Sequence, residues 1–361
     1  MQIHPVVRKK YELSSVESGK IGTAQDSAAL SVVIPIYNCR HLLESGMSAM
    51  AEWIDLAHEV FVVDSRSTDG SLNFLRENIK HNRVTFIQRE RGLYESWNAG
   101  IANTSGRWIY ISTAGDTIQK VHLQHLIEVG ERLDADVVLS EPTFVGNNNQ
   151  LAPQMLWPVG KLLKSLKISS PVLLDSEMAQ YFAFRFCPSA LLGSSASNLY
   201  RGDHLRLRPF PSTFGGAGDA GWIMEVAHES RLSITPRVGS VFRLHAKEGS
   251  DFVPPNLFRM MIEQGYANLR MKGSIGRPLR TFEREARLDI YCNSLWTKRR
   301  NARQCNNLSL AIILKLIWLQ VLYLFYRSGL SAIRIKNKAL MSKFPIFVKP
   351  LNARRQSGSR N

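Results

Sequence analysis

Three aspartates stand where a carboxylate could hold or activate a substrate. Asp64 ends the apolar run VFVVD, where a carboxylate can accept hydrogen bonds from a base or a ribose. Asp116 follows the apolar run RWIYIST, where one carboxylate could hold a divalent cation against two phosphates. Asp219 lies in the glycine-rich stretch GGAGDAGW, where a turn at the mouth of a helix suits a general base. Each also has a structural alternative, because aspartate commonly caps helices and turns.

Two further side chains could complete such a site. Trp222 follows Asp219 by three residues and could offer an apolar face to a sugar, with packing in the core as its alternative. His245 ends the run SVFRLH, and a neutral imidazole is a suitable ligand for Mn²⁺. Because a lone histidine is usually structural, the residue alone leaves both roles open.

Alternating strands and helices would bring the three aspartates to one edge of a sheet. Short β-branched runs predict strands, and the periodic segments between them predict helices. The predicted strands are 31–36, 60–64, 84–88, 107–113 and 136–140, and the predicted helices are 40–53, 71–79, 93–103 and 121–133. This order predicts an α/β fold, with a mostly parallel sheet and helices on both faces. Ligands bind at the carboxyl ends of the strands in such sheets, and the polar clusters stand there.

The chain divides into three segments of different character. Residues 1–29 are polar and lack periodicity, so we expect an irregular lead-in. Residues 30–250 hold the α/β domain, in which the irregular stretch 146–207 predicts loops and short helices that cover the site. Residues 251–361 predict a helical, basic C-terminal region. Later in the domain, the pattern predicts a helix over 218–230 and a strand over 240–245.

The net charge of +16 is concentrated near the C-terminus. Fourteen Lys or Arg residues lie between Lys298 and Arg360, and no acidic residue follows Asp289. The rest of the chain is nearly neutral, which argues against a nucleic-acid-binding face and favours attachment to an anionic membrane surface. The first twenty residues lack the apolar run of a signal peptide, and the four cysteines are widely spaced. We therefore expect a cytoplasmic protein, peripheral on the cytosolic face of the membrane.

The segment 308–326 is the candidate for that attachment. Its 19 residues are apolar almost all round and just reach the length of a membrane span. Lys315 would lie near the middle of the bilayer in a span, at a cost of about 2.5–3.5 kcal/mol. We favour a helix lying in the membrane interface. A spanning helix and a helix packed on the domain are the alternatives.

Five stretches resemble, in the expected order, the motifs of the family 2 glycosyltransferases of the GT-A fold. They are SVVIPIYN, VVDSRSTDG, GLYESWNAGIANTSGRWIYISTAGD, GDAGW and FRLHAKEGS, and they run from Ser31 to about Ser250. The resemblance implies a Rossmann-like GT-A domain and inverting transfer of a sugar from a nucleotide diphosphate donor, most often of uridine or thymidine. The acceptor would be a hydroxyl of a glycan or a lipid-linked glycan in surface polysaccharide synthesis.

The resemblance also implies a role for each candidate residue. Asp219 would be the catalytic base that deprotonates the acceptor, and Trp222 would contact the acceptor. Asp116 would coordinate Mn²⁺ or Mg²⁺, with His245 completing the metal shell. The residues that would contact the donor are Pro35, Tyr37, Asp64, Gly115 and Asp116. The chain has Gly115-Asp116 where an aspartate pair is common, and Gly218-Asp219 where many members have Glu-Asp.

Two other functions stay open. A non-catalytic protein that binds sugar nucleotides would fit the single aspartate of the metal motif. A polyprenyl-phosphate glycosyltransferase would differ from the leading hypothesis only in its acceptor. A nucleic-acid binder is disfavoured, because leucines and isoleucines are interleaved with the basic residues of the tail.

Overall fold

The computed structural model describes most of the α/β domain and two helices beyond it. The described residues are 29–146, 150–152, 157–187, 190–244, 255–271, 310–341 and a few positions between 284 and 295. The expected lead-in over 1–29 therefore lies outside the described residues, apart from Ala29.

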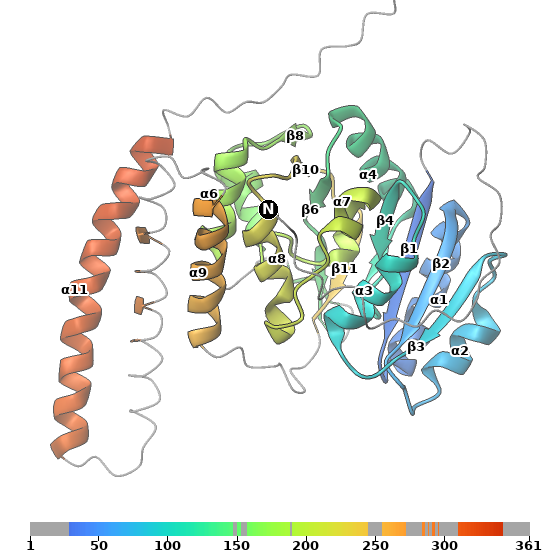
Figure 1. Cartoon of the computed structure of the whole chain (residues 1–361), viewed down its shortest axis with the longest axis horizontal. Coiled ribbons are helices and arrows are strands. Elements are labelled where there is room, and N and C mark those ends of the chain that lie inside the picture. The colour runs from blue at the N-terminus through green and yellow to red at the C-terminus, as the bar shows by residue number, and fades with distance from the viewer. Residues whose placement is uncertain are drawn as a thin grey trace, which may run out of the picture.

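An eight-stranded sheet crosses the middle of the domain (Figure 1). Its order is β3-β2-β1-β4-β9-β6-β10-β8. The strands are β1 (Leu30–Ile36), β2 (Ala57–Asp64), β3 (Val84–Gln88), β4 (Trp108–Ile111), β6 (Val137–Ser140), β8 (Val172–Leu173), β9 (Asn198–Arg201) and β10 (Leu232–Thr235). The pairs β1–β2, β2–β3, β1–β4 and β6–β10 are parallel, whereas β9 is antiparallel to β4 and β6. The predicted mostly parallel sheet is confirmed.

Helices cover both faces of this sheet, as its sequence pattern requires. They are α1 (Arg40–Trp53), α2 (Ser71–Asn78), α3 (Leu93–Asn103), α4 (Lys120–Leu133), α5 (Pro158–Ser165), α6 (Ser176–Phe186), α7 (Gly202–Leu207), α8 (Gly218–Val226), α9 (Pro255–Met271) and α11 (Leu310–Met341). On β1, Val32 and Ile34 pack in the same core as α1, α2 and α4, whereas Val33 packs in the core that contains α3, α6 and α8. Successive residues of a strand face opposite ways, so a strand buried on both faces is apolar throughout.

The segment 146–207 contributes more to the fold than loops and short helices. Its strand β9 lies in the middle of the sheet between β4 and β6, and α6 buries most of its surface. β9 has only four residues, NLYR, with a polar residue at each end, so it lacks the long apolar run that identified the other strands. A smaller sheet, in the order β5-β11-β7, is formed by β5 (Thr117–Ile118), β7 (Thr143–Val145) and β11 (Ser240–Arg243).

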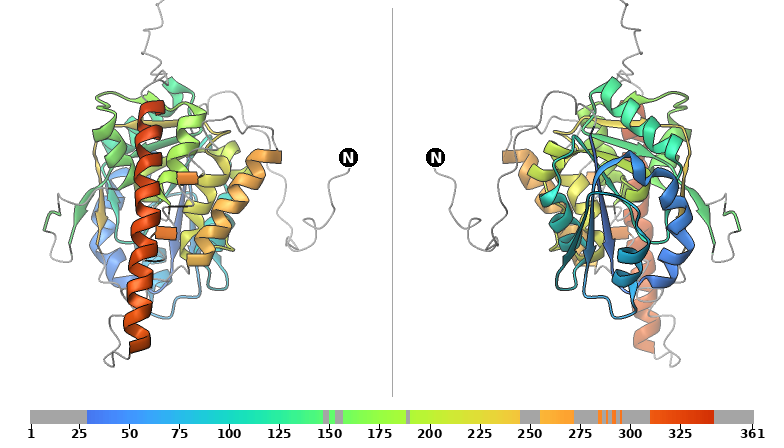
Figure 2. Two further views of the ribbon diagram at one scale, coloured as in Figure 1. Left: turned by 90° about the vertical axis from the view of Figure 1, so that its left-hand side faces the viewer. Right: turned by 90° about the vertical axis from the view of Figure 1, so that its right-hand side faces the viewer.

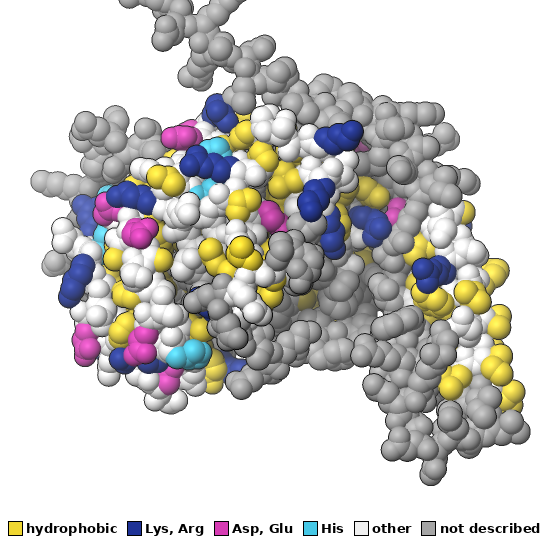
Figure 3. All heavy atoms as spheres, turned by 180° about the vertical axis from the view of Figure 1, so that it is seen from behind, with side chains coloured by type: hydrophobic (Ala, Val, Ile, Leu, Met, Phe, Trp, Pro, Cys, Tyr) yellow, Lys and Arg dark blue, Asp and Glu magenta, His cyan; other side chains and the backbone are white. Residues whose placement is uncertain are grey.

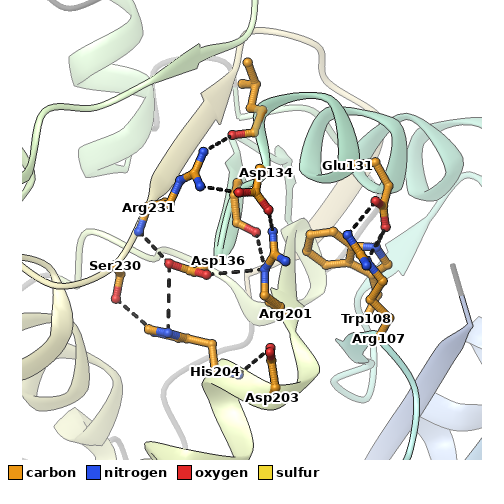
Figure 4. Close-up of polar contacts among 12 residues, drawn as sticks. Arg107, Trp108, Glu131, Asp134, Asp136, Arg201, Asp203, His204, Ser230 and Arg231 are labelled. Carbon is orange, nitrogen blue, oxygen red and sulfur yellow. Dashed lines mark hydrogen bonds and ion pairs between the residues drawn. The ribbon is translucent and has the colours of Figure 1, made fainter. Parts of the chain in front are cut away.

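A network of charges holds β9 in place at the end of the sheet where the parallel strands begin (Figure 4). Arg201, the last residue of β9, pairs with Asp134 (Nη2–Oδ1, 2.6 Å) and with Asp136 (Nε–Oδ1, 3.3 Å). Asp136 also accepts a hydrogen bond from the backbone N–H of Arg231 at 2.8 Å, and Arg231 pairs with Asp134. Because these residues precede β6 and β10, the network joins three adjacent strands at the edge opposite the carboxyl ends of the parallel strands.

Helix α11 stands at one end of the molecule, beyond α6 and α9 (Figure 1 and Figure 2). Its 32 residues contain the part of segment 308–326 that the structure describes. Together with α9, it confirms the predicted helical C-terminal extension.

Candidate functional site

Asp64 lies at the carboxyl end of β2 and organises the loop that follows. Its side chain is fully buried, and its carboxylate accepts hydrogen bonds from the backbone N–H of Ser67 (3.1 Å to Oδ1) and from Nε2 of Gln88 (2.9 Å to Oδ2). Gln88 is in register with Asp64 on the neighbouring strand β3. The carboxylate thus has the loop-capping role that was the structural alternative, and its role toward a donor stays a prediction.

Tyr37 offers an exposed aromatic ring near the carboxyl end of β1. The ring is 41% exposed, and the guanidinium carbon of Arg91 lies 4.6 Å from its centroid. The next residue, Asn38, has a φ of +43° and accepts a hydrogen bond from the backbone N–H of Thr68 at 2.8 Å. The loops after β1 and β2 are therefore joined, which places Tyr37 on the same edge as Asp64. Pro35 lies within the sheet.

Asp116 is held by hydrogen bonds from three different parts of the chain. Its Oδ2 accepts from Thr113 Oγ1 (2.6 Å) and Ser194 Oγ (3.2 Å), and its Oδ1 accepts from the backbone N–H of Arg243 (3.1 Å). Gly115 has a φ of +88°, a left-handed conformation that favours glycine and turns the loop after β4. Burial raises the pKa of Asp116 to about 6, although these hydrogen bonds oppose the rise. The loop that contains Asp116 also lines a small pocket against α1.

The surroundings of Asp116 fit a divalent cation that takes most of its ligands from the donor. Mg²⁺ and Mn²⁺ prefer oxygen ligands, and Mg²⁺ is typically bound by one or two protein carboxylates together with phosphates and water. Thr113 and Ser194 add hydroxyl oxygens beside the carboxylate, and a cation would favour its ionised form. Within the described part of the chain, no three His, Cys, Asp or Glu residues form a metal-binding group. The predicted ligand His245 lies outside the described residues.

Asp219 lies in the first turn of α8, partly exposed, and the side chain of Tyr94 lies beside it, with its hydroxyl donating to the backbone carbonyl of Gly216 at 3.5 Å. Its Oδ1 also accepts a hydrogen bond from the backbone N–H of Ala220 at 2.7 Å. Burial raises the pKa of Asp219 to about 6, and the hydrogen bonds from Ala220 and Tyr94 limit that rise. A carboxylate with a pKa close to neutrality is suited to accept a proton at physiological pH.

Tyr94 is fixed from several sides beside Asp219. Its ring stacks with Phe210 and meets Trp97 edge to face, with centroids 5.6 and 5.0 Å away. A Cβ on Gly218 would lie 2.4 Å from the ring of Tyr94, so only glycine fits before Asp219. Burial raises the pKa of Tyr94 well above its usual value, and the charge of Asp219 adds to the rise. The phenol therefore stays protonated, and its hydroxyl can donate either to the carbonyl of Gly216 or to the carboxylate of Asp219.

A chain of contacts connects Asp116 with Asp219. Ser194, which donates to Asp116, is followed by Ser195, whose hydroxyl lies 3.4 Å from that of Tyr200. The ring of Tyr200 meets that of Trp222, three residues after Asp219 in α8, with centroids 6.0 Å apart. The segment 194–200 therefore connects the loop of Asp116 with α8, the helix that contains Asp219.

Helix α3 connects Asp219 with the loop that follows Asp64. Tyr94 in its first turn contacts Asp219, and the hydroxyl of Ser96 lies 2.7 Å from that of Ser65, which follows Asp64. The three aspartates are therefore arranged around one edge of the sheet, although they are far apart in the sequence.

Trp222 does not line this site. Its side chain is 1% exposed, and its Nε1 donates to the backbone carbonyl of Arg208 at 2.5 Å. Its ring packs against Phe210, with centroids 5.0 Å apart. The expected contact with the acceptor is wrong for this structure, because both faces of α8 are buried and the indole belongs to the core.

Several residues of the site were not identified from the sequence. Tyr94 stands in the stretch GLYESW but received no role there, although a tyrosine in the first turn of a helix can reach a neighbouring loop. Thr113 precedes Asp116 by three residues, a spacing typical of turns in which a hydroxyl bonds a carboxylate. Ser194 lies in the irregular segment 146–207, where no pattern indicates which serine reaches the site.

Comparisons with known proteins agree with this architecture. Residues 31–186 match the family described as Glycosyl transferase family 2, a region that includes Asp64 and Asp116 but ends before Asp219. Two proteins of Streptococcus pneumoniae serotype 4 are similar to part of the chain. Glycosyltransferase GlyG is 29% identical over 116 residues, which are 31% of this chain and 38% of the relative. Glycosyltransferase GlyA is 25% identical over 112 residues, which are 30% of this chain and 16% of the relative.

Solved structures resemble the fold over a larger part of the chain. The structure of S. aureus TarS 1-349 in complex with UDP-GlcNAc has a TM-score of 0.56, covers 81% of this chain and 79% of that chain, and is 17% identical. A second structure of S. aureus TarS 1-349 has a TM-score of 0.53, covers 78% of this chain and 76% of that chain, and is also 17% identical. At this identity the likeness shows the fold.

Proposed function

Because this chain belongs to glycosyltransferase family 2 and has the GT-A fold, we propose that it transfers a sugar from a uridine or thymidine diphosphate donor to a hydroxyl group. The acceptor is a glycan or a lipid-linked glycan of a surface polysaccharide. The observation that carries the proposal is the pair of carboxylates, Asp116 and Asp219, on the loop after β4 and on the helix α8, which the segment 194–200 connects. The UDP-GlcNAc in the complex of S. aureus TarS 1-349 is a uridine diphosphate sugar, which supports a donor of this class.

Asp219 activates the acceptor in this reaction. Its carboxylate takes the proton of the acceptor hydroxyl, while the hydroxyl oxygen forms a bond to the anomeric carbon of the donor sugar. The bond between that carbon and the diphosphate oxygen breaks, and the nucleoside diphosphate leaves with the bonding electrons. Because attack and departure occur on opposite faces, one displacement inverts the anomeric configuration. Tyr94 holds the carboxylate in place during proton transfer.

Asp116 acts at the leaving group. Its carboxylate, with the hydroxyls of Thr113 and Ser194 beside it, would hold Mn²⁺ or Mg²⁺ at the diphosphate. The cation supplies positive charge that offsets the charge developing on the diphosphate. His245 belongs to the same proposed metal shell. Gly115 allows the tight turn that brings Asp116 to this position.

The nucleoside end of the donor binds between Tyr37 and Asp64. The exposed ring of Tyr37 supplies an apolar face for the base, and Pro35 precedes it on β1. Asp64 accepts a hydrogen bond from the base. Its carboxylate already accepts hydrogen bonds from Gln88 and from the backbone of Ser67, so one of these must break or be shared with the base.

A screen of nucleotide sugars tests the proposed donor. We expect one uridine or thymidine diphosphate sugar to raise the unfolding temperature of the purified protein in the presence of Mn²⁺, and to raise it less when EDTA replaces the metal. Slow hydrolysis of the bound donor would then separate an enzyme from a non-catalytic binder. Equal stabilisation by nucleotides of every base, or binding without any hydrolysis or transfer, would contradict the proposal.

The substitution Tyr94→Phe is expected to move the pH dependence of transfer upward. Asp219 must be ionised to accept a proton, so kcat/KM should rise with pH through the pKa of Asp219, near 6, and then level off. Removing the phenol hydroxyl removes a hydrogen bond that lowers this pKa. The midpoint of the rise should therefore move to higher pH by about one pH unit, since a hydrogen bond to a charged group contributes ~1.5 kcal/mol.

The measurement is a pH–rate profile at saturating Mn²⁺, which keeps Asp116 ionised. Tyr181→Phe is a matched control, because Tyr181 is another buried tyrosine and contacts Glu285 instead of Asp219. An unchanged midpoint in Tyr94→Phe would show that Tyr94 does not set the protonation of the base.

A further inference from the structure

We propose that the outward face of α11 docks on an anionic membrane surface, with the helix lying parallel to that surface. Six large apolar side chains form this face, which we call the α11 apolar face, and each is more than half exposed. They are Leu314, Ile317, Trp318, Val321, Leu324 and Phe325. Residues three, four and seven positions apart lie on the same side of a helix, so the six form one continuous stripe over three turns.

The opposite side of the helix is covered by the protein itself. Leu319 and Leu330 are 3% exposed, and the ring of Tyr326 meets that of Tyr291 at a centroid distance of 4.5 Å. Figure 3 shows hydrophobic side chains along this helix, at the end of the molecule away from the sheet. The helix therefore packs on the chain with one side and presents an apolar side outward, a combination that costs free energy in water.

The length of the α11 apolar face favours a helix that lies on the membrane. Leu316–Ile333 is long and apolar enough to cross a membrane by length and composition. However, among the described side chains of α11 the exposed apolar stripe runs from Leu314 to Phe325, which is about 18 Å, whereas the hydrocarbon core is about 30 Å thick. Between Phe325 and Ile333, the exposed side chains are those of Arg327, Ser328, Ser331 and Ala332, and the first three of these suit the headgroup region. A span would also have to strip away the contacts of Leu319 and Leu330.

The positive charge of the sequence around α11 indicates that the α11 apolar face contacts an anionic membrane. All fourteen charged residues from Lys298 to Arg360 are basic, and α11 lies inside this stretch. Juxtamembrane Lys and Arg side chains are attracted to the negative headgroups of an anionic leaflet. A stripe of apolar side chains within an all-basic stretch matches a surface with acyl chains below and negative headgroups above. A second copy of this chain would instead bring two basic stretches together.

Vesicle sedimentation with the full chain tests the proposal. We expect the protein to sediment with vesicles of phosphatidylcholine and phosphatidylglycerol. Its affinity for vesicles of phosphatidylcholine alone should be lower by roughly tenfold or more. The triple variant Ile317→Gln, Val321→Gln, Leu324→Gln should bind the anionic vesicles at least ~10-fold less tightly, because three apolar side chains no longer enter the interface. Glutamine is a good helix former, so α11 itself should persist.

A matched triple variant controls for the general loss of exposed apolar side chains. Val121→Gln, Leu207→Gln and Val238→Gln lie outside α11 at similar exposure, and this variant should bind vesicles like the unmodified chain. Equal binding of both triple variants would overturn the proposal. So would membrane-bound protein that resists alkaline extraction, which is the behaviour of a span. Self-association without vesicles that the α11 variant abolishes would assign the face to a second copy. Donor stabilisation is measured on the same samples, so failure here is distinct from failure of the proposed transfer.

Discussion

The variant Asp219→Asn is expected to bind the donor normally but to transfer sugar ~10²–10⁴-fold more slowly, the range that general base catalysis contributes. Asparagine keeps the size of the side chain, and its oxygen can still accept the backbone hydrogen bond that Ala220 donates at 2.7 Å. It cannot take a proton from the acceptor hydroxyl. The chemical step should therefore fail while the donor side of the site, on the far side of Tyr94, is unchanged.

The chain contains a close control for this substitution. Asp203 also follows a glycine in the first turn of a helix, and its Oδ1 accepts a hydrogen bond from the next backbone N–H at 2.8 Å. It is exposed and lies near the charge network at the other edge of the sheet (Figure 4). Asp203→Asn should leave the turnover unchanged. Initial rates of transfer and donor calorimetry are the two measurements, and wild-type turnover in Asp219→Asn would remove Asp219 from the proposed role.

The variant Asp116→Ala is expected to lose the metal-dependent part of donor binding. Calorimetry with and without Mn²⁺ should give two affinities in the unmodified protein that differ by at least ~10-fold, and a single, weak affinity in the variant, since Asp116 is the carboxylate that would hold the cation. The transfer rate should fall with the affinity, because charge on the leaving diphosphate is no longer offset. An unchanged affinity in Mn²⁺ would refute the metal role of Asp116.

The unfolding temperature of a variant at Asp116 shows whether removing the carboxylate damages the fold as well as donor binding. Burial raises the pKa of Asp116 above that of an unfolded aspartate, so the folded chain binds the proton more tightly. The contribution of Asp116 to the free energy of unfolding is therefore greatest below the unfolded pKa, falls as pH rises toward about 6, and is smallest at neutral pH. Asp116→Asn removes that penalty, so we expect its unfolding temperature at neutral pH to be no lower than that of the unmodified chain. Asp55→Asn, an exposed aspartate paired with Lys120 at 2.6 Å, serves as a control for donor binding.

The strands and helices that could be predicted are those whose amino-acid composition reflects their burial. The strands over Val60–Asp64 and Val84–Gln88 are apolar runs bounded by polar loops, and the structure has β2 and β3 there. Helix α3 was predicted with its observed bounds, because Gly92 precedes a periodic segment. β9 and β10 were missed, since the four-residue strands NLYR and LSIT have polar residues at half of their positions and lack a long apolar run.

The position of a candidate residue could be predicted where that residue ends a strand or follows one closely. Asp64 is the last residue of β2, and Asp116 lies in the loop that follows β4, on the side of the sheet that the order of strands and helices predicted. Trp222 was misassigned because its distance from Asp219 says nothing about which side of α8 faces the core. Tyr94 and Ser194 reach the aspartates only through tertiary contacts with α8 and with the loop after β4, which no local pattern records.

The antiparallel strand β9 determines how much of the chain is needed to build the catalytic domain. The region that matches the family ends at Phe186, yet β4 and β6 are joined only through Asn198–Arg201, and β6 needs Leu232–Thr235 on its other side. A chain cut after the family match would leave the centre of the sheet with two unpaired strand edges and without the turn that carries Asp219. During synthesis, about fifty residues after Phe186 must therefore leave the ribosome before the strands β4 and β6 can be paired on all their edges.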